Sequence, residues 1–246
     1  MLTYGHRGFS GCYPENTMIS FKAAINEAHC DGIELDVHLT KDDQLVIIHD
    51  ELVDRTTDGK GLVMNKTLKE LKELDASYNF PQFKGIAKIP TFEEYCQYMS
   101  KKLTVVTNVE IKSNLIYYKD IEEKVIKMIK KYGLENNVII SSFNHQSIVF
   151  TKAIDENIPC GLLQDSKGLI NAGYMAHKMR VEFYHPDIST LTKEAVDECI
   201  MNGIILNVWT VNDMESLKKC VDWGITGIIT NYPDIVKEYL VARGLN

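Results

Sequence analysis

Eight short runs rich in β-forming residues alternate with helix-like segments along the chain of 246 residues. The runs are 2–5, 32–37, 103–112, 137–143, 159–163, 182–186, 204–210 and 226–230. The helix-like segments include 17–32, 119–134, 145–157, 192–203 and 213–224, and several end in a glycine suited to a helix C-terminus. This alternation predicts an α/β fold, a closed (β/α)8 TIM barrel, because parallel strands need crossover helices. An open doubly wound sheet is the alternative that periodicity does not exclude.

The run 45–50 interrupts this alternation. Only KDDQ separates it from the preceding strand, whereas a parallel crossover needs a dozen or more residues. We therefore expect an antiparallel hairpin with its turn centred on Asp42 and Asp43. This register pairs Asp36 with His49, with their Cβ atoms about 5 Å apart. The hairpin would then bring an imidazole to the end of the second barrel strand.

Residues 51–100 follow a different pattern. DRTTDGKG is rich in turn residues, TLKELKELDA has the pattern of a short helix, and YNFPQFKGIAKIPTF is irregular and aromatic. We expect one barrel domain over 1–246 with an insertion at about 51–100, after the second barrel strand. The insertion would form a small lid or subdomain over the barrel mouth. A long surface loop without a role is the alternative.

The composition narrows the class of protein. With 45% apolar and 25% charged residues, the chain has the composition of a soluble globular protein. A net charge of -7 argues against nucleic-acid and anionic-membrane binding, because phosphate groups are held by an excess of Lys and Arg. There is no apolar run of about 20 residues and no signal-peptide pattern, so we expect a cytoplasmic protein without a stable membrane anchor. Six scattered cysteines without C-x-x-C spacing favour reduced thiols over disulfides or a zinc site. The oligomeric state stays open.

Acidic side chains recur on strands that are otherwise apolar. Glu34 and Asp36 share one face of their strand, and Glu110 and Lys112 share one face of theirs. In a barrel that face points inward, where like charges repel unless a proton or a cation neutralises them. Oxygen ligands from Glu34, Asp36 and Glu110 suit one divalent cation, Mg²⁺ or Ca²⁺, better than zinc. An isolated E-x-D is more often a solvated or salt-bridged surface pair, but here a second strand repeats the pattern beside two histidines.

Those histidines, His6 and His49, fall at strand ends next to the carboxylates. An imidazole has a pKa near 6.5, so a pair of them can take one proton and give another at neutral pH. This pairing favours phosphodiester cleavage, without deciding which histidine is the base. His38 shares the face of Asp36 and His49, so it is either a partner of the site or a rival for the base.

Two basic residues, Arg7 and Lys112, would add positive charge for an anionic substrate. Lys112 also has a simpler interpretation, in which it neutralises the adjacent carboxylates. Both roles are compatible, since one ammonium group can contact a carboxylate and a phosphate oxygen.

Several short motifs occur together in a specific order. They are HRG (6–8), PENT (14–17), ELDVHLTKD (34–42), HD (49–50), NVEIK (108–112), SSF (141–143) and NVWTVN (207–212). With them the chain resembles the glycerophosphodiester phosphodiesterase family over nearly its whole length. Two departures are Phe9, where the family has a small residue, and DDQ in place of an Asp-Gly turn.

The resemblance implies a phospholipase-C-like phosphodiesterase barrel that hydrolyses glycerophosphodiesters to an alcohol and sn-glycerol 3-phosphate with Mg²⁺ or Ca²⁺. It implies His6 and His49 as the catalytic pair and Glu34, Asp36 and Glu110 as metal ligands. Arg7, Lys112 and Trp209 would contact the substrate, and the glycerol 2-hydroxyl would attack phosphorus to give a cyclic phosphate. For Trp209, core packing is the alternative. We expect Glu15 and Asn16 to cap the first helix and to brace the HRG turn.

Two other functions stay open at this stage. A related barrel could act on lysophospholipids, as a lysophospholipase D does, which would require an apolar channel or rim. A barrel that binds a ligand without catalysis is the other, and the presence of every acid, base and ligand position argues against it.

Overall fold

The computed structural model describes residues 1–165 and 171–245. In these ranges eight parallel strands form a closed ring in the order β1-β9-β8-β7-β6-β5-β4-β2, and β1 also pairs with β2. Strand β3 pairs antiparallel with β2. The bounds are β1 (Leu2–His6), β2 (Gly32–Leu39), β3 (Leu45–Ile47), β4 (Val106–Ile111), β5 (Val138–Ser142), β6 (Cys160–Gln164), β7 (Phe183–Pro186), β8 (Ile205–Val208) and β9 (Gly227–Thr230). The predicted (β/α)8 barrel is confirmed.

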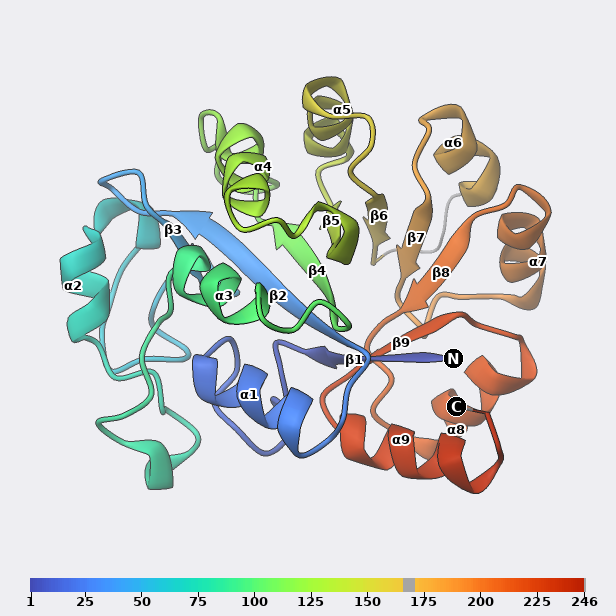
Figure 1. Cartoon of the computed structure of the whole chain (residues 1–246), viewed down its shortest axis with the longest axis horizontal. Coiled ribbons are helices and arrows are strands. Elements are labelled where there is room, and N and C mark those ends of the chain that lie inside the picture. The colour runs from blue at the N-terminus through green and yellow to red at the C-terminus, as the bar shows by residue number, and fades with distance from the viewer. Residues whose placement is uncertain (166–170, 246) are drawn as a thin grey trace.

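Helices surround the barrel (Figure 1). They are α1 (Met18–Asn26), α2 (Leu68–Glu73), α3 (Phe92–Met99), α4 (Ile121–Lys131), α5 (His145–Ile154), α6 (Ala172–Lys178), α7 (Lys193–Met201), α8 (Met214–Asp222) and α9 (Pro233–Ala242), with short 3-10 turns at Val63–Asn65, Pro81–Phe83 and Glu135–Asn137. The helix-like segments named from the sequence do not include α3, α6 or α9. None of the helices in the described ranges has the length and apolarity needed to cross a membrane.

Alternation along β2 separates the core from the site. Ile33, Leu35 and Val37 are fully buried in the main hydrophobic cluster, which includes apolar residues of the surrounding helices. Burial of each such side chain contributes about 1.5–3 kcal/mol. The residues between them therefore face the inside of the barrel, which is where Glu34 and Asp36 lie.

The hairpin between β2 and β3 forms as predicted, but the predicted register is wrong by one residue. The observed partners are Val37 with Ile47, His38 with Val46 and Leu39 with Leu45. The turn contains one residue more than we expected, because Asp43 adopts a left-handed φ of 60° and Thr40 N–H bonds to the Gln44 carbonyl at 3.0 Å. The Ile48 N–H therefore donates to the backbone carbonyl of Asp36 at 3.1 Å, and His49 lies beyond the strand.

The insertion after β3 shares a small hydrophobic cluster with that strand. Its buried members are Val46, Ile48, Val53, Val63, Leu71, Ala76, Ala87 and Ile89. Helix α2 lies beside β3 at one edge of the molecule in Figure 1. Val46 also forms an isolated bridge with Thr91. The insertion therefore packs on the hairpin that leads to His49, and its role as a lid stays a prediction.

Candidate active site

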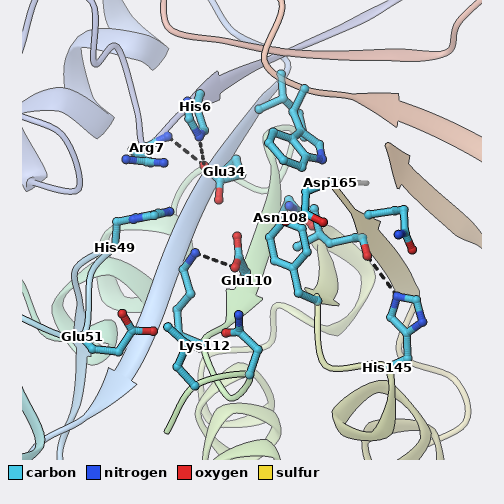
Figure 2. A pocket seen from close by; sticks show the side chains of 17 residues that line it. His6, Arg7, Glu34, His49, Glu51, Asn108, Glu110, Lys112, His145 and Asp165 are labelled. Atoms are coloured by element: carbon cyan, nitrogen blue, oxygen red, sulfur yellow. Dashed lines mark hydrogen bonds and ion pairs between the residues drawn. The ribbon is translucent and has the colours of Figure 1, made fainter. Parts of the chain in front are cut away.

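A cavity of about 660 Å³ opens at the carboxyl ends of the barrel strands. This is the end of a (β/α)8 barrel at which catalytic residues are found. Figure 2 shows the side chains around it. The lining residues are His6, Arg7, Glu34, His49, Glu51, Asn108, Glu110, Lys112, Asn114, Leu115, Phe143, His145, Leu163, Gln164, Asp165, Trp209 and Ile229. The cavity thus contains every residue predicted for the site except Asp36, which lies directly behind it.

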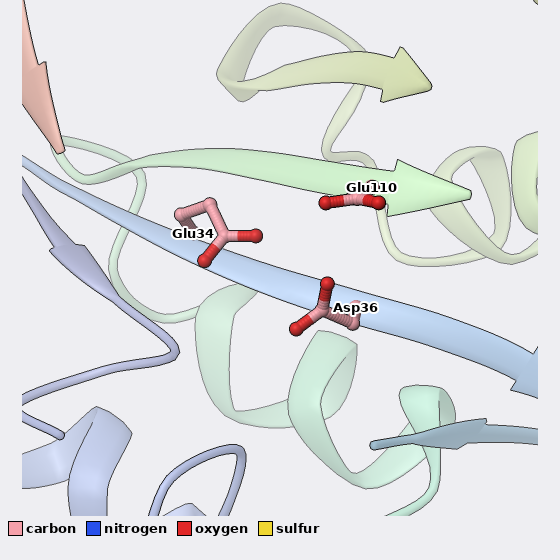
Figure 3. A group of neighbouring side chains, drawn as sticks. All are labelled: Glu34, Asp36 and Glu110. Atoms are coloured by element: carbon pink, nitrogen blue, oxygen red, sulfur yellow. The ribbon is translucent and has the colours of Figure 1, made fainter. Parts of the chain in front are cut away.

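The three predicted carboxylates meet at the β2–β4 boundary (Figure 3). Glu34 and Asp36 extend from the same face of β2, and Glu110 is the parallel partner of Asp36 on β4. One oxygen atom from each lies within 4.8 Å of the others. All three side chains are buried, with residue exposures of 4%, 1% and 6%. Strand register therefore brings three acidic groups from distant sequence positions to one point.

The charge of this cluster is only partly balanced by neighbouring cations. The Lys112 ammonium lies 3.0 Å from Asp36 Oδ1 and 2.6 Å from Glu110 Oε1. The Arg7 backbone N–H donates to Glu34 Oε2 at 2.9 Å, and its side-chain Nε lies 3.7 Å from Asp36 Oδ2. Three carboxylates thus share two cationic side chains.

Burial and mutual repulsion change how these groups titrate. Burial, together with the charges of Asp36 and Glu110, raises the pKa of Glu34 well above its usual value. Burial also raises the pKa of Glu110, although Lys112 opposes the change. Burial would raise the pKa of Asp36 as well, but the charge of Lys112 and other cationic neighbours lowers it overall. The cluster therefore holds more negative charge than its protein partners stabilise.

The donor set fits a hard divalent cation. Its members are all carboxylate oxygens, which Mg²⁺ and Ca²⁺ prefer, whereas the described residues place no cysteine or histidine among them. Carboxylate oxygens bind Ca²⁺ at about 2.3–2.6 Å, so three oxygens within 4.8 Å of one another would be close enough to share such an ion. A bound cation would also relieve the repulsion that raises the pKa of Glu34.

His6, at the end of β1, faces this cluster. Its Nδ1 lies 2.6 Å from Asn231 Oδ1, which as an amide oxygen accepts a hydrogen bond, so Nδ1 carries the proton in the neutral ring. Its Nε2 lies 3.9 Å from Glu34 Oε2. Burial, assisted by the charge of Arg7, lowers the pKa of His6 to about 3. The ring is therefore neutral, with an unprotonated nitrogen toward the cavity.

His49 follows β3 and lies on the same side of the cavity as His6 and Arg7 in Figure 2. Its Nδ1 lies 2.6 Å from Asp50 Oδ1. The observed hairpin register places His49 just beyond β3 rather than beside Asp36, and the residue still lines the cavity. Both predicted catalytic imidazoles thus line one cavity.

The HRG turn owes its shape to residues of the PENT motif. Arg7 has a left-handed φ of 54°, and a Cβ on Gly8 would lie 2.4 Å from Ser20 Oγ. Asn16 N–H donates to the Arg7 carbonyl at 3.0 Å, and Asn16 Nδ2 donates to Asp36 Oδ2 at 2.7 Å. The expected brace is therefore present. The expected helix cap is wrong, since the side chain of Thr17 caps α1.

His38 lies behind the cavity and does not line it. Its Nε2 donates to the His49 carbonyl at 3.1 Å, because a carbonyl oxygen can only accept. Its Nδ1 therefore accepts from the Tyr118 hydroxyl at 2.9 Å. Burial lowers the pKa of His38 to about 4, so this bonding pattern belongs to a neutral ring. Both nitrogens are engaged, and of the two interpretations left open for His38 the geometry favours a partner of the site.

The opposite wall is largely apolar and aromatic. Trp209 packs edge-on against Phe143 with ring centroids 5.6 Å apart, and its Nε1 donates to the His185 carbonyl at 2.8 Å. His145 Nε2 donates to the Leu163 carbonyl at 3.0 Å (Figure 2). The sequence did not assign roles to Phe143 or to Asn108. Both could have been noticed, since Phe143 directly follows a strand and Asn108 shares the inward face of Glu110.

Asn108 has a further property that indicates a ligand site. Its side chain is only 1% exposed, yet neither its amide oxygen nor its amide nitrogen makes a hydrogen bond to any described residue. Buried amides are nearly always paired. An unpaired amide at the wall of a cavity is suited to contact a polar ligand.

Comparison with known proteins agrees with this geometry. Residues 6–235 match the model of the glycerophosphoryl diester phosphodiesterase family. A glycerophosphodiester phosphodiesterase of Caldanaerobacter subterraneus subsp. tengcongensis is 45% identical over 243 residues, covering 99% of this chain and 98% of its own length.

Solved structures give the same result. A glycerophosphodiester phosphodiesterase from Thermotoga maritima is 30% identical with a TM-score of 0.80, covering 97% of this chain and 98% of that one. A phosphodiesterase from Oleispira antarctica, solved in complex with the product sn-glycerol-3-phosphate, is 27% identical with a TM-score of 0.86 and covers 98% and 97%.

Proposed function

Because this chain belongs to the glycerophosphoryl diester phosphodiesterase family, we propose that it releases sn-glycerol 3-phosphate from glycerophosphodiesters by metal-assisted catalysis with His6 and His49. The family makes the chain a phosphoric diester hydrolase. The natural substrates would be deacylated phospholipids, whose diester links glycerol phosphate to a second alcohol. The product bound to the Oleispira antarctica relative supports the same chemistry.

The observation that carries this proposal is the meeting of three carboxylates and two imidazoles around one cavity. Glu34, Asp36 and Glu110 would hold the divalent cation. When bound, such a cation supplies positive charge where phosphoryl oxygens become more negative in the transition state. The Arg7 guanidinium would bind a phosphate oxygen, and the Lys112 ammonium would both neutralise the carboxylates and contact the substrate.

Proton transfer falls to the two imidazoles. One ring would remove the proton of the glycerol 2-hydroxyl as this oxygen attacks phosphorus, and the other would protonate the departing alkoxide. The cyclic phosphate formed in this way is then opened by water, with the two roles reversed. His6 presents an unprotonated Nε2 and so has the form that a base requires. Trp209 and Phe143 would form the wall against the carbon skeleton of the substrate.

A substrate panel tests the proposal. Purified protein is given glycerophosphocholine, glycerophosphoethanolamine, glycerophosphoglycerol and a lysophospholipid, and release of glycerol 3-phosphate or of lysophosphatidic acid is measured. The lysophospholipid belongs in the panel because Leu115 lines the cavity and is 76% exposed, as an apolar rim would require. We expect release from the short diesters, loss of activity with a chelator, and recovery with Mg²⁺ or Ca²⁺.

The alternatives give different results in the same assay. A lysophospholipase D would cleave the lysophospholipid in preference to the short diesters. A barrel that only binds its ligand would cleave none of them. Full activity in the presence of a chelator would exclude metal-assisted hydrolysis while leaving the hydrolase itself in place.

A further inference from the structure

One arginine of the insertion binds two carboxylates at once. The Arg55 side chain contacts Glu15 through Nη1 to Oε2 at 2.8 Å and Nη2 to Oε1 at 2.7 Å. It contacts Asp50 through Nε to Oδ2 at 2.7 Å and Nη2 to Oδ1 at 3.0 Å. All these donors belong to one planar guanidinium, which matches the fork geometry of a carboxylate on two sides.

Each of these carboxylates in turn holds a residue of the active site. Asp50 Oδ1 bonds to His49 Nδ1 at 2.6 Å, and Glu15 Oε1 bonds to Arg7 Nη1 at 2.9 Å. These are the same two oxygens that share Arg55 Nη2. A continuous chain of hydrogen bonds therefore runs from His49 through Asp50, Arg55 and Glu15 to Arg7. Its two ends are the imidazole and the guanidinium of the cavity.

The ionised carboxylates of the hydrogen-bond chain fix the proton of His49 on Nδ1. Burial would raise the pKa of Asp50, but hydrogen bonds from His49 and Arg55 lower it overall, so the group is ionised at neutral pH. The pKa of Glu15 is likewise lowered, because its bonds to Arg55 and Arg7 outweigh burial. An ionised carboxylate can only accept, so His49 must donate from Nδ1. In the neutral ring, Nε2 is then the atom left free for proton transfer.

The partial exposure of these side chains indicates that the hydrogen-bond chain orders the site more than it stabilises the fold. The Arg55, Asp50 and Glu15 side chains are 42%, 30% and 20% exposed. Ion pairs exposed to this degree add little to the free energy of unfolding, since water and salt screen them. Their geometry is nevertheless well defined, because each partner makes more than one bond.

We propose that Arg55 is a positioning residue for the hydrolysis, which couples the placement of His49 to that of Arg7 through Asp50 and Glu15. The inference rests on the proposed function, because it assumes that His49 moves a proton and that Arg7 binds phosphate. It also gives the insertion a role, which is to deliver this arginine to the edge of the site.

Single variants test each link of the hydrogen-bond chain. Arg55→Gln should lower kcat/KM by about 10- to 100-fold, the usual effect of losing a group that orients an active-site residue. Asp50→Asn and Glu15→Gln should each lower kcat and raise KM together, because breaking either bond releases both His49, which transfers protons, and Arg7, which binds phosphate. Arg55→Lys should recover little, since an ammonium cannot bond to both carboxylates in a fork. Arg243→Gln, an exposed arginine outside the cavity, is the matched control and should retain wild-type activity.

A double-mutant cycle tests the coupling itself. Asp50→Asn and Glu15→Gln are combined once with Arg55 present and once with Gln at position 55. With Arg55 present, the double variant should lose much less than the product of the two single losses, because either change already breaks the chain. With Arg55→Gln the two effects should multiply. Thermal melts of every variant check folding, and we expect melting temperatures within a few degrees of the wild type.

The outcomes separate the inference from the proposed function. Wild-type kcat/KM in Arg55→Gln would overturn the inference, and so would effects of Asp50→Asn and Glu15→Gln that multiply whether or not Arg55 is present. If Arg55→Gln does not fold, the cycle in the presence of Arg55 decides alone, with independent effects counting against the coupling. Absence of diester hydrolysis by the wild-type protein would instead remove the proposed function.

Discussion

The two halves of the barrel contribute very different side chains to one cavity. Strands β1 to β4, with the hairpin, supply both imidazoles, the three carboxylates, Arg7 and Lys112. Strands β5 to β9 and the segments after them supply Phe143, Leu163, Trp209 and Ile229, with His145, Gln164 and Asp165 as the polar exceptions. The first half has the groups that can move protons and bind a cation, and the second half has a wall. Reaction chemistry and substrate shape can therefore change separately in this fold.

The difference follows from strand register. Neighbouring parallel strands place partner residues close enough to share a ligand, as Asp36 and Glu110 do. A cation site therefore needs adjacent strands. A wall that packs against a substrate needs only apolar surface in the right place. It can therefore be built from residues that follow different strands, such as Phe143 and Trp209.

The largest expected effect lies in the charged half. His49→Ala and His6→Ala should each lower kcat by about 10²- to 10⁴-fold, the usual contribution of general acid or base catalysis. His145→Ala, an imidazole of the other half, should cost at least tenfold less than either, because its Nε2 is bonded to the Leu163 carbonyl. Initial rates of glycerol 3-phosphate release measure all three. Equal losses from the three variants would mean that the two halves share the chemistry.

The cation site should be a property of the charged half alone. Mg²⁺ or Ca²⁺ at 100 times its Kd should stabilise the wild-type protein by about 2.7 kcal/mol, since it binds only the folded state. This stabilisation would appear as a higher melting temperature in the presence of the ion. Glu110→Gln should abolish that increase, and Glu215→Gln, a change at an exposed residue of α8, should retain it. Thermal melts with and without the ion are the measurement. An ion-dependent increase that survives Glu110→Gln would place the cation elsewhere.

Removing the aromatic wall should affect binding more than chemistry. Trp209→Leu should weaken substrate binding by about 1–2 kcal/mol, a five- to thirtyfold increase in KM with kcat little changed. The other tryptophan of the chain, Trp223, lies under Lys219 and does not line the cavity, so Trp223→Leu is the matched control. A fall in kcat for Trp209→Leu with unchanged KM would mean that the wall takes part in the reaction step.

The smallest effect concerns stability in acid. His185 of the second half is fully buried, and this burial lowers its pKa to about 3 from 6.5. The unfolded chain binds the proton below about pH 6.5 and the folded chain does not, so stability is complete above that pH and falls as the pH drops toward 3. One such proton costs at most about 1.4 kcal/mol per pH unit. Urea unfolding between pH 8 and 5 should show that the free energy of unfolding falls less steeply with pH in His185→Asn than in the wild type. Equal slopes in the two proteins would contradict the role given to His185.

The sequence was sufficient to predict the barrel and to predict which side chains would come together in it. Alternation placed Glu34 and Asp36 inward, and strand order placed Glu110 beside them, because both depend on a period that holds across a whole strand. The hairpin register was wrong because a single left-handed residue, Asp43, lengthens the turn. Glycine is the residue that signals this conformation clearly, whereas aspartate is enriched in it but adopts it in only a minority of cases.

The contacts of the site were harder to predict than its members. Arg55 lies in the turn-rich part of the insertion, 40 residues from Glu15, so no spacing rule joins the two. The pairing of His38 with Tyr118 spans 80 residues and depends on a loop after β4. Side-chain networks of this kind depend on where loops come to rest, and single-sequence patterns do not contain that information.

The closure of the ring between β1 and β9 has a consequence for synthesis on the ribosome. His6 is made 225 residues before Asn231, which is the partner of its Nδ1. The barrel cannot seal before β9 has been translated, since β1 pairs with it. A nascent or prematurely terminated chain that lacks this strand would have both histidines and all three carboxylates without an oriented His6. Diester cleavage should therefore begin only when translation has passed the last barrel strand.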